Sequence, residues 1–201
     1  SITKIASGID ISLKTSRELQ RTTGGNPLFV TGILPYITKD IEKTGEVPYS
    51  LQEIILMKLN GIPGKGPEFV DGGSVYGDIF DKDVLKDVVN LNQAIIGEII
   101  QKAENEGLVR KSLTGEELEF SNTIIREIIY ERLLKKKIDF FRIRIAEAIV
   151  KSKTKDLKKL YKAMIMFFLA DDDRSLNLAL KLAHIYKKRS ERDILRNIFF
   201  R

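Results

Sequence analysis

The chain contains no cysteine and a single histidine among its 201 residues. Without cysteine there is no disulfide framework and no thiolate chemistry, and no Cys–His or Ser–His–Asp nucleophile system can be assembled. His184 lies in a helical pattern, where an imidazole is far more often packed or exposed than bound to a metal, so we expect no metal site. Carboxylate pairs such as Glu116–Glu117 fall in predicted turns, where solvated side chains are the rule. The sequence therefore predicts no catalytic residue.

Long apolar runs are also missing. No stretch is long enough to cross a bilayer, so we predict no membrane span, and no signal peptide is recognisable. The chain begins at Ser1 rather than Met, and we expect it to be a fragment of a longer protein. Its residues are 43% hydrophobic and 31% charged, as in globular proteins, and they suffice for one large or two small domains. The lack of cysteine suits a reducing compartment, and we predict a cytoplasmic location.

Charge is distributed unevenly along the chain. Residues 1–131 carry 14 Lys and Arg against 20 Asp and Glu, a net charge of −6. Residues 132–201 carry 20 Lys and Arg against 8 Asp and Glu, a net charge of +12. A basic half can meet nucleic acid, an anionic membrane or an acidic module, but a solvated lysine-rich face is the simpler interpretation and the one we favour.

Hydrophobic periodicity predicts helices in the first half of the chain. We expect them over 12–23, over 27–43 with a kink at Pro35, from the capping box 50–53 to about 60, and over 81–89 and 93–106. Asp81 or Asp83 would cap the fourth of these helices, Asn92 the fifth, and Gly107 would end it. The segment around Phe69–Tyr76 is the predicted helix with the least support in the sequence, because Gly72, Gly73 and Gly77 disfavour a helix. Apolar residues expected to face inward include Leu51, Ile54, Ile55, Met57, Leu59, Ile95, Ile96, Ile99, Ile100 and Ala103.

Two short strands are predicted next, over 108–113 and 117–120, around a Thr114–Gly115 turn. Helix, helix, strand, turn, strand is the order of a winged helix. From Thr123 onward the pattern is helical, with a lysine-rich joint over 151–159 and an antiparallel helix pair over 160–170 and 176–186 that resembles the start of a TPR-like array. Apolar residues of the helical stripes here are Ile124, Ile125, Ile128, Ile129, Leu133, Leu134, Phe140, Phe141, Ile145, Ala148 and Ile149.

Two segments carry the functional hypothesis. The first reads TTGGNPLFV from Thr22 to Val30: Asn26 is a good helix cap, and Pro27 at the first helical position loses no hydrogen bond. Taken alone it is an ordinary helix start. The second reads LEFSNTIIREIIY from Leu118 to Tyr130, about ninety residues further on.

Together the two segments resemble the C-terminal half of a STAND-class nucleotide switch, a signal-transduction P-loop ATPase related to the AAA superfamily. In bacterial members a TGGNPLFV box lies in the helical lid behind the nucleotide, and an FSHxxIRExxY box lies in the winged-helix domain that follows. The resemblance covers most of residues 12–150. It implies a mainly α-helical chain with a helical lid over 1–48, a winged-helix domain with a small β-hairpin wing over 49–131, and a helical linker with the start of TPR-like repeats over 132–201.

The resemblance also implies a nucleotide site. Gly25, Asn26 and Pro27 would cover the adenine of ATP or ADP, and Asn122 would lie near the β-phosphate, where relatives carry histidine. Asparagine can donate a hydrogen bond to phosphate but carries no charge and cannot titrate. Capping the following helix is an equally good interpretation of Asn122. Arg126, one turn further on, either reaches phosphate or forms a structural salt bridge, which we favour.

No G-x-x-x-x-G-K-[ST] motif occurs, so the phosphate cradle and the magnesium-binding hydroxyl would come from a P-loop domain upstream of Ser1. We expect no ATP hydrolysis by these residues alone. The predicted role is regulatory: lid and winged helix close over the nucleotide and relay its state to the C-terminal helices, which bind protein partners.

Two alternatives stay open, a DNA-binding winged-helix transcriptional regulator and a helical protein-interaction scaffold. DNA binding is less favoured, because the predicted recognition helix over 93–106 sets Glu98, Glu104 and Glu106 against Lys102.

Overall fold

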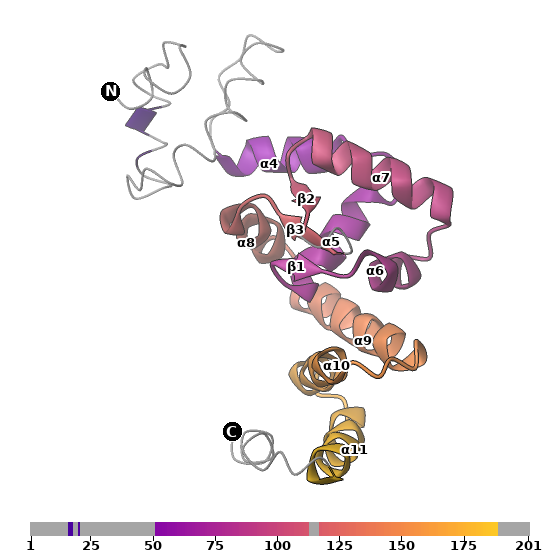
Figure 1. Ribbon diagram of the computed structural model, residues 1–201. Helices are drawn as coiled ribbons and strands as arrows, with labels where there is room; N and C mark the ends of the chain where they lie inside the picture. Colours follow the sequence, from indigo (N-terminus) through magenta and orange to yellow (C-terminus); the bar gives the residue numbers. More distant parts are fainter. Residues whose placement is uncertain (1–15, 18–19, 21–50, 113–116, 189–201) are drawn as a thin grey trace.

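The computed structural model describes residues 16–17, 20, 51–112 and 117–188. The expected lid over 1–48, with Gly25, Asn26 and Pro27, lies outside these residues except for short pieces of its first helix, and so does the tip of the expected hairpin. The described part is mainly helical with one small antiparallel sheet, which confirms the predicted fold class at that level (Figure 1). None of its helices is both long enough and apolar enough to span a membrane.

The elements follow one another in a simple order. They are α4 (Leu51–Asn60), α5 (Gly66–Tyr76), β1 (Ile79–Phe80), α6 (Lys82–Val89), α7 (Gln93–Asn105), β2 (Val109–Lys111), β3 (Leu118–Phe120), α8 (Thr123–Glu131), α9 (Lys135–Lys151), α10 (Leu157–Leu169) and α11 (Arg174–Lys188). In Figure 1, α4 to α8 surround the sheet, and α9, α10 and α11 extend away from it in sequence order.

The sheet has the strand order β1-β3-β2, with all pairs antiparallel. Glu119 in the central strand lies opposite Ile79 on one side and Arg110 on the other. The two predicted strands are β2 and β3. The strand β1 was missed because two residues are too short to show an alternating pattern.

Helix starts follow the capping residues that the sequence predicts. Asp81 Oδ1 accepts hydrogen bonds from the backbone of Asp83 and Val84 at 2.9 and 3.2 Å, and Asn92 Oδ1 accepts one from Ile95 at 2.9 Å. Gly107 adopts a positive φ of 70°, as expected for the glycine that ends α7. These starts and stops are local, which is why the sequence predicts them.

The helix predicted around Phe69–Tyr76, which had the least support in the sequence, is present as α5. It runs for 11 residues, and its Phe69 and Val70 are fully buried. A Cβ atom at Gly73 would lie 3.1 Å from two ring carbons of Phe80, and one at Gly72 would lie 3.3 Å from Phe141. The glycines therefore let aromatic rings pack directly on the helix backbone, and this packing outweighs their low helix propensity.

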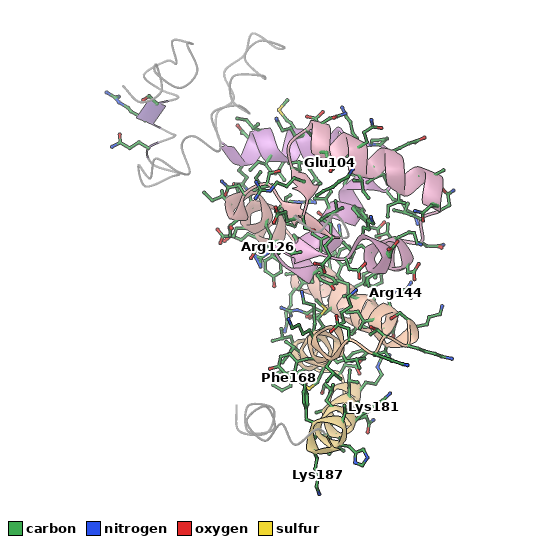
Figure 2. All side chains as sticks on the ribbon, in the orientation of Figure 1. Glu104, Arg126, Arg144, Phe168, Lys181 and Lys187 are labelled. Carbon is green, nitrogen blue, oxygen red and sulfur yellow. The ribbon has the colours of Figure 1, made fainter. Side chains whose placement is uncertain are left out.

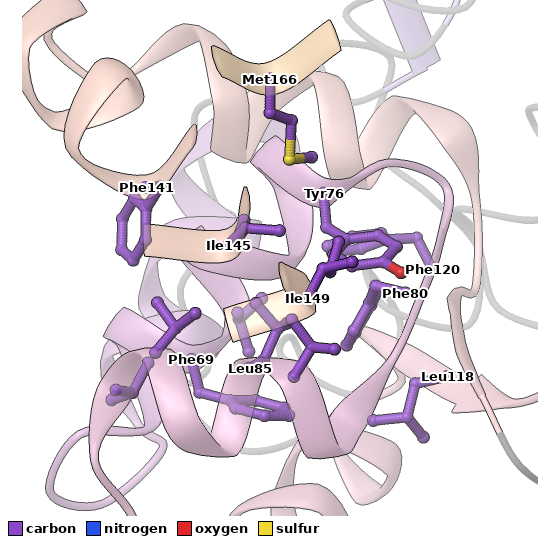
Figure 3. Close-up of a cluster of buried hydrophobic side chains, with 14 of the residues drawn as sticks. Phe69, Tyr76, Phe80, Leu85, Leu118, Phe120, Phe141, Ile145, Ile149 and Met166 are labelled. Carbon is purple, nitrogen blue, oxygen red and sulfur yellow. The ribbon is translucent and has the colours of Figure 1, made fainter. Parts of the chain in front are cut away.

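One hydrophobic core runs from α4 to α11. Figure 3 shows side chains from α5, α6, the sheet, α9 and α10 meeting in it. Among the largest fully buried side chains are Phe69, Phe80, Leu85, Leu118, Phe141, Ile145 and Ile149. The C-terminal helices are thus built onto the same core as the sheet.

Four apolar residues expected inside the core are exposed. Met57 lies two residues from both Ile55 and Leu59, which places it on the opposite face of α4. Ile95 lies in the first turn of α7, where Gln93 and Ala94 are exposed as well, whereas the next residue, Ile96, faces the core. Leu134 is the cap residue of α9, and Phe140, which is half-exposed, lies edge-on to Phe141. Single exposed apolar residues of this kind are ordinary.

The lysine-rich joint is shorter than expected. Asp156 Oδ1 accepts a hydrogen bond from the backbone of Lys158 at 2.8 Å, so α10 begins at Leu157 rather than at Leu160. Helix α10 packs against both α9 and α11. Its buried Ala163 allows close approach, as the small residues in this region predict.

Substitutions at two helical glycines, Gly73 in α5 and Gly97 in α7, should have opposite effects on stability. Gly73→Val should lower the free energy of unfolding by about 1–3 kcal/mol, because the branched side chain must displace Phe80. Gly97→Ala, where a new Cβ meets nothing within 4 Å, should raise it by about 0.5–1 kcal/mol. Urea unfolding followed by circular dichroism measures both, and a Gly73→Val chain as stable as the wild type would contradict this packing.

Candidate functional site

Asn122 lies where β3 ends and α8 begins, and it caps that helix. Its Oδ1 accepts a hydrogen bond from the backbone of Ile124 at 2.9 Å, and the side chain is half-buried. Of the four predicted nucleotide-site residues, it is the one that falls in the described part of the chain. The capping interpretation is thereby confirmed, and the side-chain amide nitrogen is not used by the cap.

Arg126 follows one turn further along α8. Its Nε lies 3.4 Å from Asp78 Oδ1, so a salt bridge is present as expected, but its partner is Asp78, which precedes β1, and not a neighbour on α8 such as Glu127. The guanidinium lies 5.9 Å from the centroid of the Tyr130 ring. The same Nε is buried and has no hydrogen-bond partner with good geometry among the described residues. Arg126 is labelled in Figure 2 on the side of the molecule where α8 lies.

Lys162 reaches the same region from α10. Its Nζ donates a hydrogen bond to the backbone oxygen of Tyr76 at 3.0 Å and lies 3.9 Å from the centroid of the Tyr76 ring. Burial lowers the pKa of Lys162, and the charge of Arg126 lowers it further, against the opposing effect of Glu117 and Asp78. Burial also raises the pKa of the Tyr76 hydroxyl, and nearby carboxylates such as Asp81 reinforce that shift.

Asp81, at the start of α6, and Lys159, on α10, form a second contact between α10 and the elements around the sheet. Lys159 Nζ lies 2.5 Å from Asp81 Oδ2, while Asp81 Oδ1 caps α6. Burial alone would raise the pKa of Asp81, but the hydrogen bonds from Lys159 and from the capped backbone outweigh it and hold the pKa below 3.8. The hydrogen bond to Asp81 raises the pKa of Lys159 above 10.5.

We call these contacts the charged junction, defined by Tyr76, Asp78, Asp81, Arg126, Lys159 and Lys162. It joins α10 to the elements around the sheet. The pKa shifts of Tyr76, Asp81 and Lys159 move these groups away from neutral pH, and among the shifts given above that of Lys162 moves toward it. Three of the four groups are thereby held in one protonation state, which suits the junction to fixing geometry. In the part of the chain that the structure describes, no cluster of His, Cys, Asp and Glu could hold a metal ion, and His184 is exposed.

A second ionic contact joins α5 to the start of α9. The Asp71 carboxylate is about 1% exposed and accepts hydrogen bonds from Arg132 and from Lys137, the latter at 2.8 Å. Sequence reasoning missed it. In the sequence, the one local indication that Asp71 is buried is its position next to the apolar pair Phe69–Val70. The partners of Asp71 are more than sixty residues away.

The outer face of α7 is weakly charged. Of its residues, Gln93, Glu98 and Gln101 are exposed, and Lys102 is engaged by Glu106 at 2.7 Å. A small groove of about 260 Å³ lies between α6, α7 and the sheet, and both signs of charge line it through Lys82, Asp83, Glu104 and Lys111. Such a face offers little attraction to a phosphate backbone.

Comparison with known proteins gave no match: no family model, no curated protein and no solved structure is significantly similar to this chain. The resemblance to the STAND class therefore rests on the residues of the two segments, and it enters the argument below as a proposal.

The Asp81–Lys159 pair predicts a pH-dependent contribution to stability. Since the folded pKa of Asp81 is lowered and that of Lys159 is raised, the pair stabilises the fold above pH 3.8 and below pH 10.5. Lys159→Met should lower the free energy of unfolding by about 1 kcal/mol at neutral pH, and this loss should shrink as Asp81 is protonated in acid.

Lys158→Met is the matched control, because Lys158 is exposed and adjacent. Urea titrations of both variants at a series of pH values make the measurement. An equal loss for the two variants, or a Lys159→Met deficit that is independent of pH, would contradict the assigned ion pair.

Proposed function

We propose that the chain is the lid, winged-helix and first helical-repeat segment of a STAND-type regulatory ATPase. In this proposal it closes over ATP or ADP held by an upstream P-loop domain, which also supplies the magnesium and the triphosphate grip. Exchange of the nucleotide releases the winged helix and moves the C-terminal helices. The chain itself contributes no catalytic group.

The order of the elements around the sheet supports the winged-helix part of the proposal. Helices α5, α6 and α7 are interleaved with β1 and followed by the β2–β3 hairpin, and β3 lies between the other two strands. A winged helix has this order, and its wing would be the hairpin whose strands are β2 and β3. The proposed domain over 49–131 then ends with α8.

The proposed relay of the nucleotide state to the C-terminal helices rests on one observation. Helices α9 and α10 are attached in two ways to the elements around the sheet. They share one core with α5 and α6. In addition, Asp71 binds Lys137 of α9, and the charged junction binds Lys159 and Lys162 of α10. Packed cores and buried ion pairs move as units, because partial displacement leaves polar groups unpaired. A rotation of the winged helix would therefore carry the C-terminal helices with it.

Asn122 can serve the nucleotide end of this switch without losing its cap. The side-chain oxygen is bound to the Ile124 backbone, and the amide nitrogen can still donate to a phosphate oxygen. The first turn of a helix also favours an anion, because its N–H groups point outward.

DNA recognition is the weaker alternative. The proposed recognition helix is α7, and its exposed face presents Glu98 with neutral Gln93 and Gln101. Contacts to DNA phosphates are made mainly by Lys and Arg, and bases are read by side chains that enter a DNA groove. An acidic side chain on the recognition helix is repelled by the phosphates on either side of that groove. This face favours an intramolecular role.

Nucleotide affinity of the longer protein that contains the P-loop domain tests the proposal. Pro27→Ala should weaken both ATP and ADP binding about tenfold, a loss of about 1.4 kcal/mol, because the rigid ring no longer covers the adenine. Pro35→Ala, which changes a proline outside the box, should leave both affinities as they are. Isothermal titration calorimetry makes the measurement, and unchanged affinity in Pro27→Ala would refute the site.

Asn122 gives the same experiment a second arm. Asn122→Asp keeps a good cap, so stability should be retained, but its charge should repel the β-phosphate and weaken ADP binding. Asn122→Ala should instead cost about 1 kcal/mol of stability through the lost cap. Wild-type ADP affinity in Asn122→Asp would remove Asn122 from the phosphate site.

A further inference from the structure

A groove of about 670 Å³ lies between α9 and α11, away from the proposed nucleotide end of the chain. Figure 2 labels Arg144 on α9 and Lys181 on α11, two of the residues that line it. Four cations and one carboxylate surround an apolar floor. The cations are Arg144, Lys151, Arg174 and Lys181, the carboxylate is Glu147, and Val150, Phe167 and Leu178 form the floor.

One of these cations is already neutralised. Arg174 binds both oxygens of Asp172 at 2.7 and 2.8 Å and Glu147 at 2.7 Å, and its guanidinium lies 4.5 Å from the centroid of the Phe167 ring. The hydrogen bond from Arg174 lowers the pKa of Asp172 to about 2. Arg174 is thus held by Asp172 and Glu147 at the side of the groove.

Two of the remaining cations have no carboxylate partner among the residues that the structure describes, and the third shares one. Lys151 and Lys181 are exposed and have no ion pair with any residue of the described part, and Arg144 lies 3.9 Å from a Glu147 that also serves Arg174. Lys151 lies one turn after Glu147 on α9, and Lys181 lies two turns after Arg174 on α11. Val150, the residue before Lys151 on α9, is 41% exposed. The groove thus combines two lysines that have no ion pair in the described part of the chain with one exposed apolar side chain, that of Val150, above the buried Phe167 and Leu178.

We infer that this groove binds a segment of a partner protein in which carboxylates flank an apolar side chain. The carboxylates pair with Lys151, Lys181 and Arg144, and the apolar side chain covers Val150 and the exposed edge of the floor. Charge complementarity would set the choice of partner, and apolar burial would add affinity. This inference does not require the nucleotide relay, because every residue involved lies on α9, α10 or α11.

The chemistry of the groove favours a peptide over a nucleic acid. A phosphate backbone gains nothing from an apolar side chain such as Val150, whereas an apolar residue between carboxylates buries it. Single-stranded nucleic acid also relies on aromatic platforms for its bases, whereas the one aromatic residue of the lining, Phe167, is buried beneath Arg174.

Fluorescence anisotropy with the whole chain tests the inference. The probe is a short labelled peptide in which glutamates alternate with leucines, and the reference probe replaces each glutamate with glutamine. The glutamate peptide should bind more tightly at low salt and lose affinity as salt rises. The double variant Lys151→Glu, Lys181→Glu should weaken its binding at least about tenfold, and Val150→Ser should weaken both peptides.

The matched control is Lys135→Glu with Lys136→Glu. It makes the same charge change on exposed lysines of α9 outside the groove, and it should leave binding within about twofold of wild type. Far-UV circular dichroism establishes that each variant is folded, and Lys151→Ala with Lys181→Ala replaces the charge reversal if that variant is not.

Three results would overturn the inference: equal binding of the two peptides, equal losses in the groove and control variants, or displacement of the peptide by a single-stranded oligonucleotide that binds more tightly. None of these results bears on Pro27 or Asn122, so failure here is distinguishable from failure of the nucleotide switch.

Discussion

A buried carboxylate, that of Asp71, holds the start of α9 against the middle of α5. An ionised carboxylate that is almost fully removed from water is costly unless its charge and lone pairs are satisfied. Arg132 and Lys137 satisfy it from opposite sides of the bend between α8 and α9. This contact fixes the position of α9 on the core, α10 packs on α9, and α11 packs in turn on α10.

The Asp71 contact also explains part of the uneven charge distribution along the chain. From the sequence, the basic half reads most simply as a solvated lysine-rich face. In the structure Lys137, Lys159 and Lys162 instead cross to Asp71, Asp81 and Tyr76 of the acidic half. Part of the opposite charge on the two halves therefore holds them together. The lysines without an ion pair among the described residues include the two that line the groove between α9 and α11.

The sequence predicted what is locally determined. The capping roles of Asp81, Asn92 and Asn122 follow from residues two or three positions away, and so do the helices that they begin. It failed where distant contacts decide. Gly72 and Gly73 argue against a helix until the rings of Phe141 and Phe80 are placed on them, and Asp71 has partners 61 and 66 residues away. The proposed adenine-covering residues, Gly25, Asn26 and Pro27, lie outside the described part, so their prediction rests on the sequence motif.

The relay requires that the elements around the sheet and the C-terminal helices behave as one unit. Native-state hydrogen exchange measures this directly, in the wild type and in Asp71→Asn. The account predicts that amides in the middle of α5 and of α10 share one opening free energy, and that Asp71→Asn lowers both by the same amount. If α10 opens at a lower free energy than α5, and Asp71→Asn leaves that value unchanged, the two parts are independent and the account is contradicted.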